Sequence, residues 1–249
     1  MKMEEELVSI IMPAYNSVRY IGEAIESVIA QTYKNWEMII VDDCSTDGTR
    51  RTVQKYLKDT RIQYVCLTVN SGGARARNHA LRIAKGQFIA FLDADDQWKP
   101  LKLSKQIAFM QRNHYGFTFT SYEIMNKDKM KRVTVPEVLN YSAFMKNTII
   151  GTLTVIINQS IIGPVRLVDI RKDHDSMTWA AILKKGNKAY GLDESLALYR
   201  KVTGSISNNK FRAVKRHWKN CRTIEQIPFF KCVYYFIFYI KNAIKKHYC

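Results

Sequence analysis

The first hundred residues alternate between short apolar runs and longer stretches whose apolar residues recur at helical spacing. Four runs rich in Val, Ile and Phe have the character of strands, and they span 7–12, 36–41, 62–69 and 87–92. The helical stretches between them cover 21–29, 47–57 and 73–84. Such alternation is typical of a parallel sheet with right-handed crossover helices. We therefore predict an α/β fold with a mostly parallel central sheet flanked by helices.

Polar segments follow three of these strand-like runs at the point where each run ends. They are Pro13-Ala14-Tyr15-Asn16, Asp42-Asp43 and Asp93-Ala94-Asp95-Asp96. In open α/β sheets, ligands bind outside the carboxyl ends of the strands. We therefore expect these separated segments to converge on one edge of the sheet and to form a binding site there.

The third segment places three acids, Asp93, Asp95 and Asp96, within four positions. Like charges this close repel and raise one another's pKa unless a cation or hydrogen-bond donors lie among them. One interpretation is a solvated turn, where Asp is common. The other is a pair of carboxylates that binds Mg²⁺ or Mn²⁺ together with a substrate diphosphate. Taken alone, the run is compatible with both.

After Pro100 the strict alternation ends. A Lys-rich helix is expected to run to about Asn113. The expected strands that follow span 117–125, 133–135, 153–157, 189–191 and 196–199, and a helix over 176–185 ends at Gly186. The likeliest boundary before the C-terminal segment is Asn208-Asn209.

The chain is strongly basic, with a formal net charge of +17, which points to a polyanionic partner such as nucleic acid, anionic lipid or a phosphorylated substrate. Residues 210–249 contain ten Lys or Arg and one acid, Glu225. A helical wheel of this tail predicts one apolar face, formed by Phe229, Val233, Phe236, Ile237, Ile240 and Ile244.

The longest uncharged piece of the tail, residues 232–240, is shorter than the about 20 residues that a membrane span needs. A basic amphipathic helix with aromatic edges suits the interface of an anionic membrane. The alternative is a helix packed on the rest of the chain or on a dimer partner, and the oligomeric state is open.

The five cysteines are an odd number, are widely scattered and include no C-x-x-C pair. This pattern argues against a disulfide framework and against a structural zinc site. The acidic N-terminal residues lack the pattern of a signal peptide, so we expect a cytoplasmic protein, peripheral at the inner face of the cell membrane.

Four motifs in the first hundred residues resemble the inverting nucleotide-sugar glycosyltransferases of family 2, which have the GT-A fold. They are VSIIMPAYN at 8–16, IIVDDCSTDGT at 39–49, ARN at 76–78 and GQFIAFLDADD at 86–96. The motifs occur in the order of the family and at its usual separations. The resemblance implies a GT-A domain over 1–208, divided into a nucleotide-sugar-binding half (1–98) and an acceptor half (99–208), and a basic aromatic tail over 209–249.

The resemblance also implies roles for individual residues of the first half. Asp93 and Asp95 form its D-x-D element, with Asp95 as a ligand of Mn²⁺ or Mg²⁺ and Asp93 contacting the metal or the ribose. Pro13, Ala14 and Tyr15 line the nucleoside pocket and Asp43 holds the pyrimidine base. Arg77 pairs with phosphate or with an Asp. For Ser45 and Asp47 we prefer helix capping.

In the second half, HDSMTW at 174–179 is similar to the E-D-x-x-x-W element of the family. The match places Asp175 at the position of the general base that deprotonates the acceptor hydroxyl, with His174 where Glu is usual. Asp173 is the next candidate, and the alternative for Asp175 is a helix cap. Near the end of this half, 196–200 and 205–207 resemble the family's Y-R and S-x-S stretch, where a loop closes over the donor diphosphate. Between them, Lys201 to Gly204 stand where many relatives carry a His, and we expect phosphate contacts from Arg200 and, more weakly, Lys201.

The function that follows is an inverting transfer of a sugar from a nucleotide sugar, a UDP-sugar by expectation, to an acceptor hydroxyl. The acceptor expected from the tail and the family is a lipid-linked saccharide of a bacterial surface polysaccharide. Two other classes of protein share features with this sequence. A nucleic-acid-binding module fits the charge but leaves the acidic segments unexplained, and no nucleic-acid partner is expected. A nucleotidyltransferase would need a basic nucleotide-anchoring loop early in the chain, where Ala14-Tyr15-Asn16-Ser17 stands.

Overall fold

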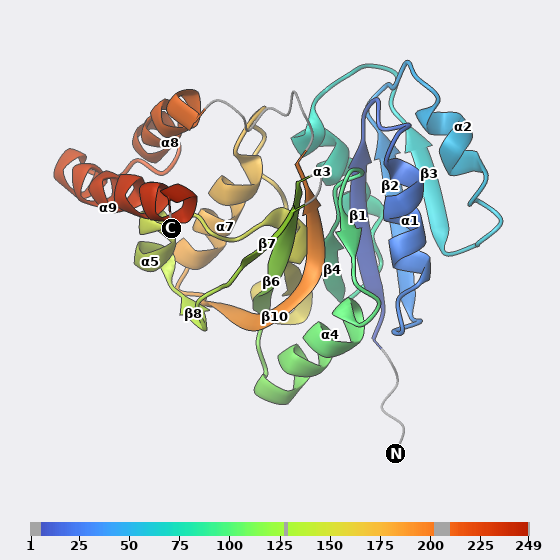
Figure 1. Ribbon diagram of the computed structural model, residues 1–249, viewed down its shortest axis with the longest axis horizontal. Coiled ribbons are helices and arrows are strands. Elements are labelled where there is room, and N and C mark those ends of the chain that lie inside the picture. Colours follow the sequence, from blue (N-terminus) through green and yellow to red (C-terminus); the bar gives the residue numbers. More distant parts are fainter. Residues whose placement is uncertain (1–5, 127–128, 202–209, 249) are drawn as a thin grey trace.

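A computed structural model describes residues 6–126, 129–201 and 210–248. Within these residues, ten strands form one mixed sheet with helices on both faces (Figure 1). The main path of the sheet runs β3-β2-β1-β4-β9-β6-β10-β5, and β7 and β8 pair with β6 and β10. The predicted α/β class is confirmed.

The first half has the predicted parallel arrangement. Its strands are β1 (Val8–Ala14), β2 (Trp36–Asp42), β3 (Ile62–Cys66) and β4 (Phe88–Phe91), and neighbouring strands of this set pair in parallel. The connecting helices are α1 (Ile21–Ile29), α2 (Thr49–Gln54) and α3 (Gly73–Ile83). α1 and α2 contribute to the apolar core on one face and α3 to the core on the other. The carboxyl ends of β1, β2 and β4 therefore meet at one edge.

The second half extends the sheet with several antiparallel pairs and one long parallel pair. Its strands are β5 (Gln97–Trp98), β6 (Phe117–Asn126), β7 (Lys129–Val133), β8 (Val138–Leu139), β9 (Ile156–Asn158) and β10 (Ala189–Arg200). Its helices are α4 (Lys102–Asn113), α5 (Tyr141–Lys146), α6 (Gln159–Ile162) and α7 (His174–Lys184). β9 pairs antiparallel with both β4 and β6 and so joins the two halves.

Four predicted strands of this half need correction. β7 ends at Val133, so the strand predicted at 133–135 overlaps it only at that residue. The stretch 153–157 is not one strand: Thr152–Thr154 form a 3-10 turn, and β9 begins at Ile156. The strands predicted at 189–191 and 196–199 are parts of the single strand β10. β10 shifts register against β6 between Leu192 and Ala197, which explains why its alternation looks interrupted in the sequence.

The C-terminal segment forms α8 (Lys210–Thr223) and α9 (Phe229–Tyr248), which lie beside α5 and α7 (Figure 1). The residues of the predicted apolar face of α9 differ in exposure, and Val233, Phe236 and Ile240 are half-buried. Cys232 and Tyr235 form the buried seam, whereas Phe229 and Ile237 are exposed. The side chain of Ile244 and the boundary at Asn208-Asn209 lie outside the described residues. Of the helices described, none is long and apolar enough to cross a membrane.

Trp179 of α7 is fully buried against the sheet. Its ring contacts Phe91 of β4 and Phe117 of β6 at centroid separations of 5.4 and 5.5 Å. Its indole N–H has no hydrogen-bond partner among the described residues. Trp179 therefore anchors the helix that carries Asp175 through apolar contact alone.

We expect Trp179→Ala to lower the free energy of unfolding by about 3–5 kcal/mol, because the change leaves a large cavity between α7 and the sheet. Trp179→Phe should cost much less, since Phe keeps an aromatic ring there and removes the unpaired N–H. Urea unfolding of both variants measures the difference. Trp218→Ala, at a half-buried position on α8, serves as the control and should cost less than Trp179→Ala.

The core contains one charged side chain that the pattern of α4 does not reveal. Lys102 is fully buried, and its Nζ donates to Gln106 Oε1 at 2.5 Å and lies 4.8 Å from the ring centre of Trp98. Burial lowers the pKa of Lys102 to about 7. The folded chain therefore favours the neutral amine.

This burial predicts a pH-dependent stability. Between about pH 7 and the ordinary Lys pKa of 10.5, the unfolded chain binds a proton at this position that the folded chain does not. The free energy of unfolding should therefore rise with pH, by about 1.4 kcal/mol per unit from this group. Urea unfolding at pH 7 and pH 9 should show a smaller rise for Lys102→Met than for wild type. An equal reduction in Lys105→Met, on the exposed side of α4, would contradict the assignment to Lys102.

Candidate active site

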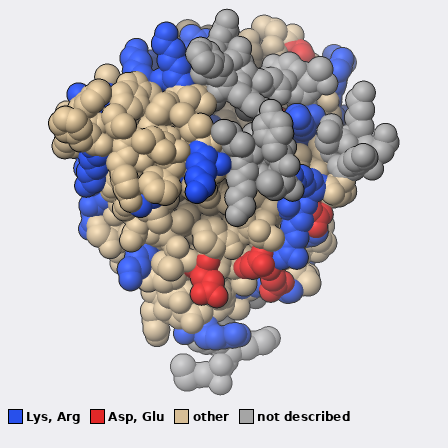
Figure 2. Space-filling model, turned by 60° about the vertical axis from the view of Figure 1, so that its left-hand side comes forward, with Lys and Arg blue, Asp and Glu red and all other residues tan. Residues whose placement is uncertain are grey.

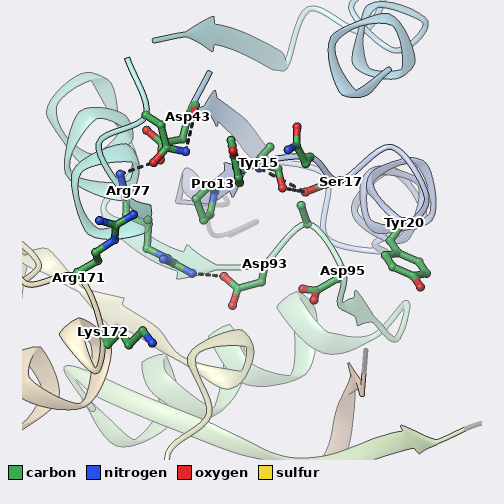
Figure 3. Close-up of a pocket in the computed structure, with 16 residues that line it drawn as sticks. Pro13, Tyr15, Ser17, Tyr20, Asp43, Arg77, Asp93, Asp95, Arg171 and Lys172 are labelled. Carbon is green, nitrogen blue, oxygen red and sulfur yellow. Dashed lines mark hydrogen bonds and ion pairs between the residues drawn. The ribbon is translucent and has the colours of Figure 1, made fainter. Parts of the chain in front are cut away.

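A cavity of about 520 Å³ opens at the edge of the sheet where β1, β2 and β4 end. Figure 3 shows the residues around it. Of the predicted site residues, seven line it: Pro13, Ala14, Tyr15, Asp43, Arg77, Asp93 and Asp95. The three polar segments thus converge as expected. Asp175 and Arg200 lie outside the lining.

The first wall is the loop that follows β1. Pro13 and Ala14 continue into Tyr15, which is half exposed, and Asn16 adopts a left-handed backbone with φ 48°. The N–H of Asn16 donates to Ser45 Oγ at 2.9 Å, and that of Val18 donates to Asp47 at 3.2 Å. Ser45 and Asp47 therefore serve the loop, and Asp47 also accepts from the N–H of Thr49 in the first turn of α2. Tyr15 itself lines the cavity.

Asp43 is buried directly after β2 and lies beside the loop that follows β1, where its N–H donates to the carbonyl oxygen of Ala14 at 2.8 Å. One carboxylate oxygen accepts from the N–H and hydroxyl of Ser71 at 2.7 and 3.0 Å, and the other accepts from the N–H of Gly72 at 2.7 Å. Asp43 thereby orders the loop before α3. Because a carboxylate has about four acceptor positions, its second oxygen can still accept a bond from the cavity.

Arg77 connects the acidic turn after β4 with the start of α7. Its guanidinium donates to Asp93 through Nη2 and to His174 Nε2 through Nη1 at 2.9 Å. The pKa of His174 is lowered by burial and by the charge of Arg77. The imidazole is therefore neutral, with Nε2 as the acceptor. Arg77 is itself buried, so this pair of contacts fixes the start of α7 against the acidic turn.

Asp95 and Asp96 carry the remaining negative charge of the turn. The pKa of Asp95 is raised to about 6 by burial and by the charge of Asp93. The pKa of Asp96 is also raised by burial and then by its two acidic neighbours, although its carboxylate accepts from the N–H of Arg200 at 2.9 Å. Among the described residues, Arg77 pairs with Asp93, and no ion pair involves the carboxylate of Asp95 or Asp96.

Arg200 has structural partners around this turn. Its Nε donates to the carbonyl oxygen of Asp95 at 3.0 Å, its Nη2 pairs with Glu23, and its guanidinium lies over the ring of Tyr20. These contacts tie the end of β10 to α1 and to the acidic turn. The predicted substrate contact of Arg200 is therefore not seen in the cavity, and neighbouring Lys201 is exposed.

The two acids at the start of α7 have different surroundings. Asp175 is half-buried and accepts from Thr152 Oγ1 at 2.7 Å. Asp173 has a left-handed backbone with φ 59° and pairs with Arg216 of α8 at 2.7 and 3.2 Å. Asn220 also donates to it at 3.2 Å. Neither acid accepts a capping bond from the first turn, so the helix-cap alternative for Asp175 is wrong.

Two cations of the cavity were not singled out from the sequence. Arg171 and Lys172 line it on the side opposite the loop after β1 (Figure 3). They immediately precede the acidic start of α7. Their position in the sequence beside a candidate general base is the signal from which their place in the site could be predicted. Together with Arg77 they place positive charge close to the acidic turn.

The fold and the sequence both have known relatives. The sequence model of Glycosyl transferase family 2 matches residues 9–163. Among solved structures, Staphylococcus aureus TarS 1–349 in complex with UDP-GlcNAc aligns with TM-score 0.73 and 20% identity, over 96% of this chain and 72% of TarS. The mannosyltransferase PcManGT from Pyrobaculum calidifontis, in complex with GDP-Man and Mn²⁺, aligns with TM-score 0.67 and 20% identity, over 88% and 65%. These likenesses concern the fold.

Two bacterial proteins match along nearly their whole length. TuaG of Bacillus subtilis (strain 168), assigned to teichuronic acid biosynthesis as a glycosyltransferase, is 49% identical over 244 residues, which cover 96% of this chain and 97% of TuaG. WfgD of Escherichia coli, a UDP-Glc:alpha-D-GlcNAc-diphosphoundecaprenol beta-1,3-glucosyltransferase, is 39% identical over 247 residues, covering 98% and 96%. With the GT-A fold and the family match, they establish that this chain is a glycosyltransferase of family 2.

Proposed function

We propose that the protein transfers a sugar, with inversion, from a UDP-sugar to a hydroxyl group of a lipid-linked saccharide. The observation that carries this proposal is the composition of the cavity. It combines an aromatic wall suited to a base, a buried carboxylate at the end of β2, and an acidic turn facing three cations. A nucleoside diphosphate bears an aromatic base at one end and a charged diphosphate at the other, which matches this arrangement.

We propose that Asp95 and Asp93 hold Mn²⁺ or Mg²⁺ together with the donor diphosphate. Within the described residues, no three His, Cys, Asp or Glu side chains form a metal site by themselves. The two carboxylates nevertheless fit a hard cation whose other ligands are phosphate oxygens. Burial and then the charge of Asp93 raise the pKa of Asp95, and a bound cation would favour its ionised form. When bound, such a cation stabilises the charge that develops on the leaving diphosphate.

The side chains around the turn have complementary roles in this scheme. Arg171 and Lys172 bind the diphosphate from the side opposite the loop after β1, and Arg77 keeps Asp93 in place. Tyr15, Pro13 and Ala14 hold the nucleoside, and Asp43 accepts from the base with its free acceptor position. For Arg200 we propose a positioning role, because its contacts fix the backbone of Asp95.

We propose Asp175 as the general base. Its Oδ2 is oriented by the hydroxyl of Thr152, and its helix is held at the cavity by His174 and Arg77. Asp173 is less suited, since Arg216 and Asn220 engage its carboxylate. One base that activates the acceptor hydroxyl, opposite a leaving diphosphate, gives a single displacement and hence inversion.

The proposed acceptor and location follow from relatives. WfgD acts, by its name, on GlcNAc-diphosphoundecaprenol, and TuaG is assigned, by its name, to teichuronic acid biosynthesis. We propose that this chain likewise extends a lipid-linked saccharide of a bacterial surface polysaccharide. Such an acceptor is held in the membrane, so the protein works in the cytoplasm at the inner membrane face.

Calorimetric titration with UDP tests the donor site. Wild type should bind UDP in the presence of Mn²⁺ and lose binding with EDTA, and Asp95→Ala should weaken metal-dependent binding at least about tenfold. Binding should also weaken as the pH falls below about 6, because a proton then competes with the cation for Asp95. Asp59→Ala, far from the cavity, should bind as wild type. Equal binding by Asp95→Ala would refute the proposed metal ligand.

Kinetics of two matched variants test the base. Asp175→Asn should lower kcat by about 10²–10⁴ while the Kd for UDP stays unchanged, because the carboxylate acts on the acceptor and not on the nucleotide. Asp173→Asn should mainly lower the free energy of unfolding by weakening its pair with Arg216. If Asp173→Asn abolishes turnover with normal stability and Asp175→Asn does not, the base is Asp173.

A further inference from the structure

The side of α9 that faces away from the domain carries large apolar side chains. Phe230 is 86% exposed and Ile237 60%, and Tyr234 and Phe238 are also exposed. These four residues recur at helical spacing along one side of α9, and we call them the outer face. Such a run of exposed aromatic and aliphatic side chains is unusual on a monomeric soluble protein and marks an interaction surface.

The opposite side of the same helix is already occupied. Cys232 and Tyr235 are buried, Tyr235 packs edge-on against Tyr141 of α5, and Tyr239 stacks on His217 of α8 at 4.1 Å. The helix is therefore attached to the domain through one side. The outer face contributes to this packing at one edge, where Nζ of Lys146 of α5 lies 4.6 Å from the ring centre of Tyr234 and 5.2 Å from that of Phe238.

Positive charge surrounds the outer face. Lys146 of α5 donates to the hydroxyl of Tyr234 at 3.0 Å, and Lys231 and Lys241 are exposed on α9 itself. The sole acid between 210 and 249, Glu225, is buried and pairs with Lys184. Figure 2 shows the side of the molecule that carries α8 and α9, with uncharged surface next to lysine and arginine side chains.

We propose that the outer face of α9 docks on an anionic membrane surface, with its apolar side chains at the level of the headgroups and the nearby lysines on the phosphates. Charge selects this occupant. A second copy meeting the same face would bring like charges together, whereas anionic lipid neutralises them. The inference rests on the proposed function in that a lipid-linked acceptor requires the enzyme at a membrane.

The docked helix pair is connected to the proposed general base. Arg216 and Asn220 of α8 hold Asp173, which lies two residues before Asp175 at the start of α7. α8 in turn packs on α9 through Trp218 and Phe236, whose rings are 5.0 Å apart. Binding through the outer face therefore sets the distance of the base from the membrane surface.

Co-sedimentation of the full chain with vesicles tests the proposal. Wild type should bind vesicles of phosphatidylcholine with phosphatidylglycerol and bind phosphatidylcholine alone much more weakly. The double variant Phe230→Ser/Ile237→Ser should bind the anionic vesicles about tenfold or more weakly, because two exposed apolar side chains are lost. Leu57→Ser/Ile161→Ser, which removes exposed apolar side chains elsewhere, should bind as wild type.

Calorimetry with UDP and Mn²⁺ on the same proteins separates this inference from the proposed function. Unchanged UDP binding by Phe230→Ser/Ile237→Ser, with weaker vesicle binding, supports the proposal. Vesicle binding equal to wild type overturns it, as does a wild type that binds UDP but no vesicle. Loss of dimerisation in this variant would assign the outer face to a second copy, and loss of oligonucleotide binding alone would assign it to nucleic acid; either result also overturns the proposal.

Discussion

The contact of Arg77 with both Asp93 and His174 is the interaction on which the site depends. The carboxyl edge of the sheet gathers Asp43, Asp93, Asp95 and Asp96 in one place, and this charge is costly unless it is compensated. Backbone N–H groups compensate Asp43, and Arg77 compensates Asp93. The same guanidinium also binds His174. The contact that balances the charge of Asp93 therefore also fixes the start of α7, the helix that carries Asp175.

His174 shows how one substitution can change the chemistry of this connection. The family resemblance places Glu at this position, and a carboxylate beside Arg77 would form an ion pair. The imidazole instead accepts as a neutral group, since burial and the adjacent guanidinium disfavour its protonation. More of the charge of Arg77 is then available to Asp93. Burial and the charge of Asp93 raise the pKa of Asp95 in the acidic turn, and a cation bound with the substrate would favour its ionised form.

The parallel half was predictable because local signals agree there. The buried strands end at Ala14, Asp42 and Phe91, and the topology of parallel strands alone brings these ends together. Partners in the second half are distant in sequence. The sequence places the positive charge of Arg200 at the end of a strand. Its partners, Glu23 and the carbonyl oxygen of Asp95, lie far away in the sequence, so no local pattern predicts these contacts. The burial of Lys102 is equally invisible, because its partners Trp98 and Thr154 are brought together by tertiary packing.

The tail illustrates a limit of the helical wheel. A helical wheel ranks the sides of a helix by apolarity and assumes that the most apolar side faces the domain or the membrane. In α9, however, aromatic residues occupy nearly every side of the helix. Which of them turn inward is decided by shape and by polar partners. Tyr235 packs on Tyr141, whose hydroxyl donates to Glu225, and Tyr239 finds a stacking surface on His217. The more apolar Phe230 and Ile237 stay outside. The packing alternative and the membrane alternative for this tail are therefore compatible, since they use opposite sides of one helix.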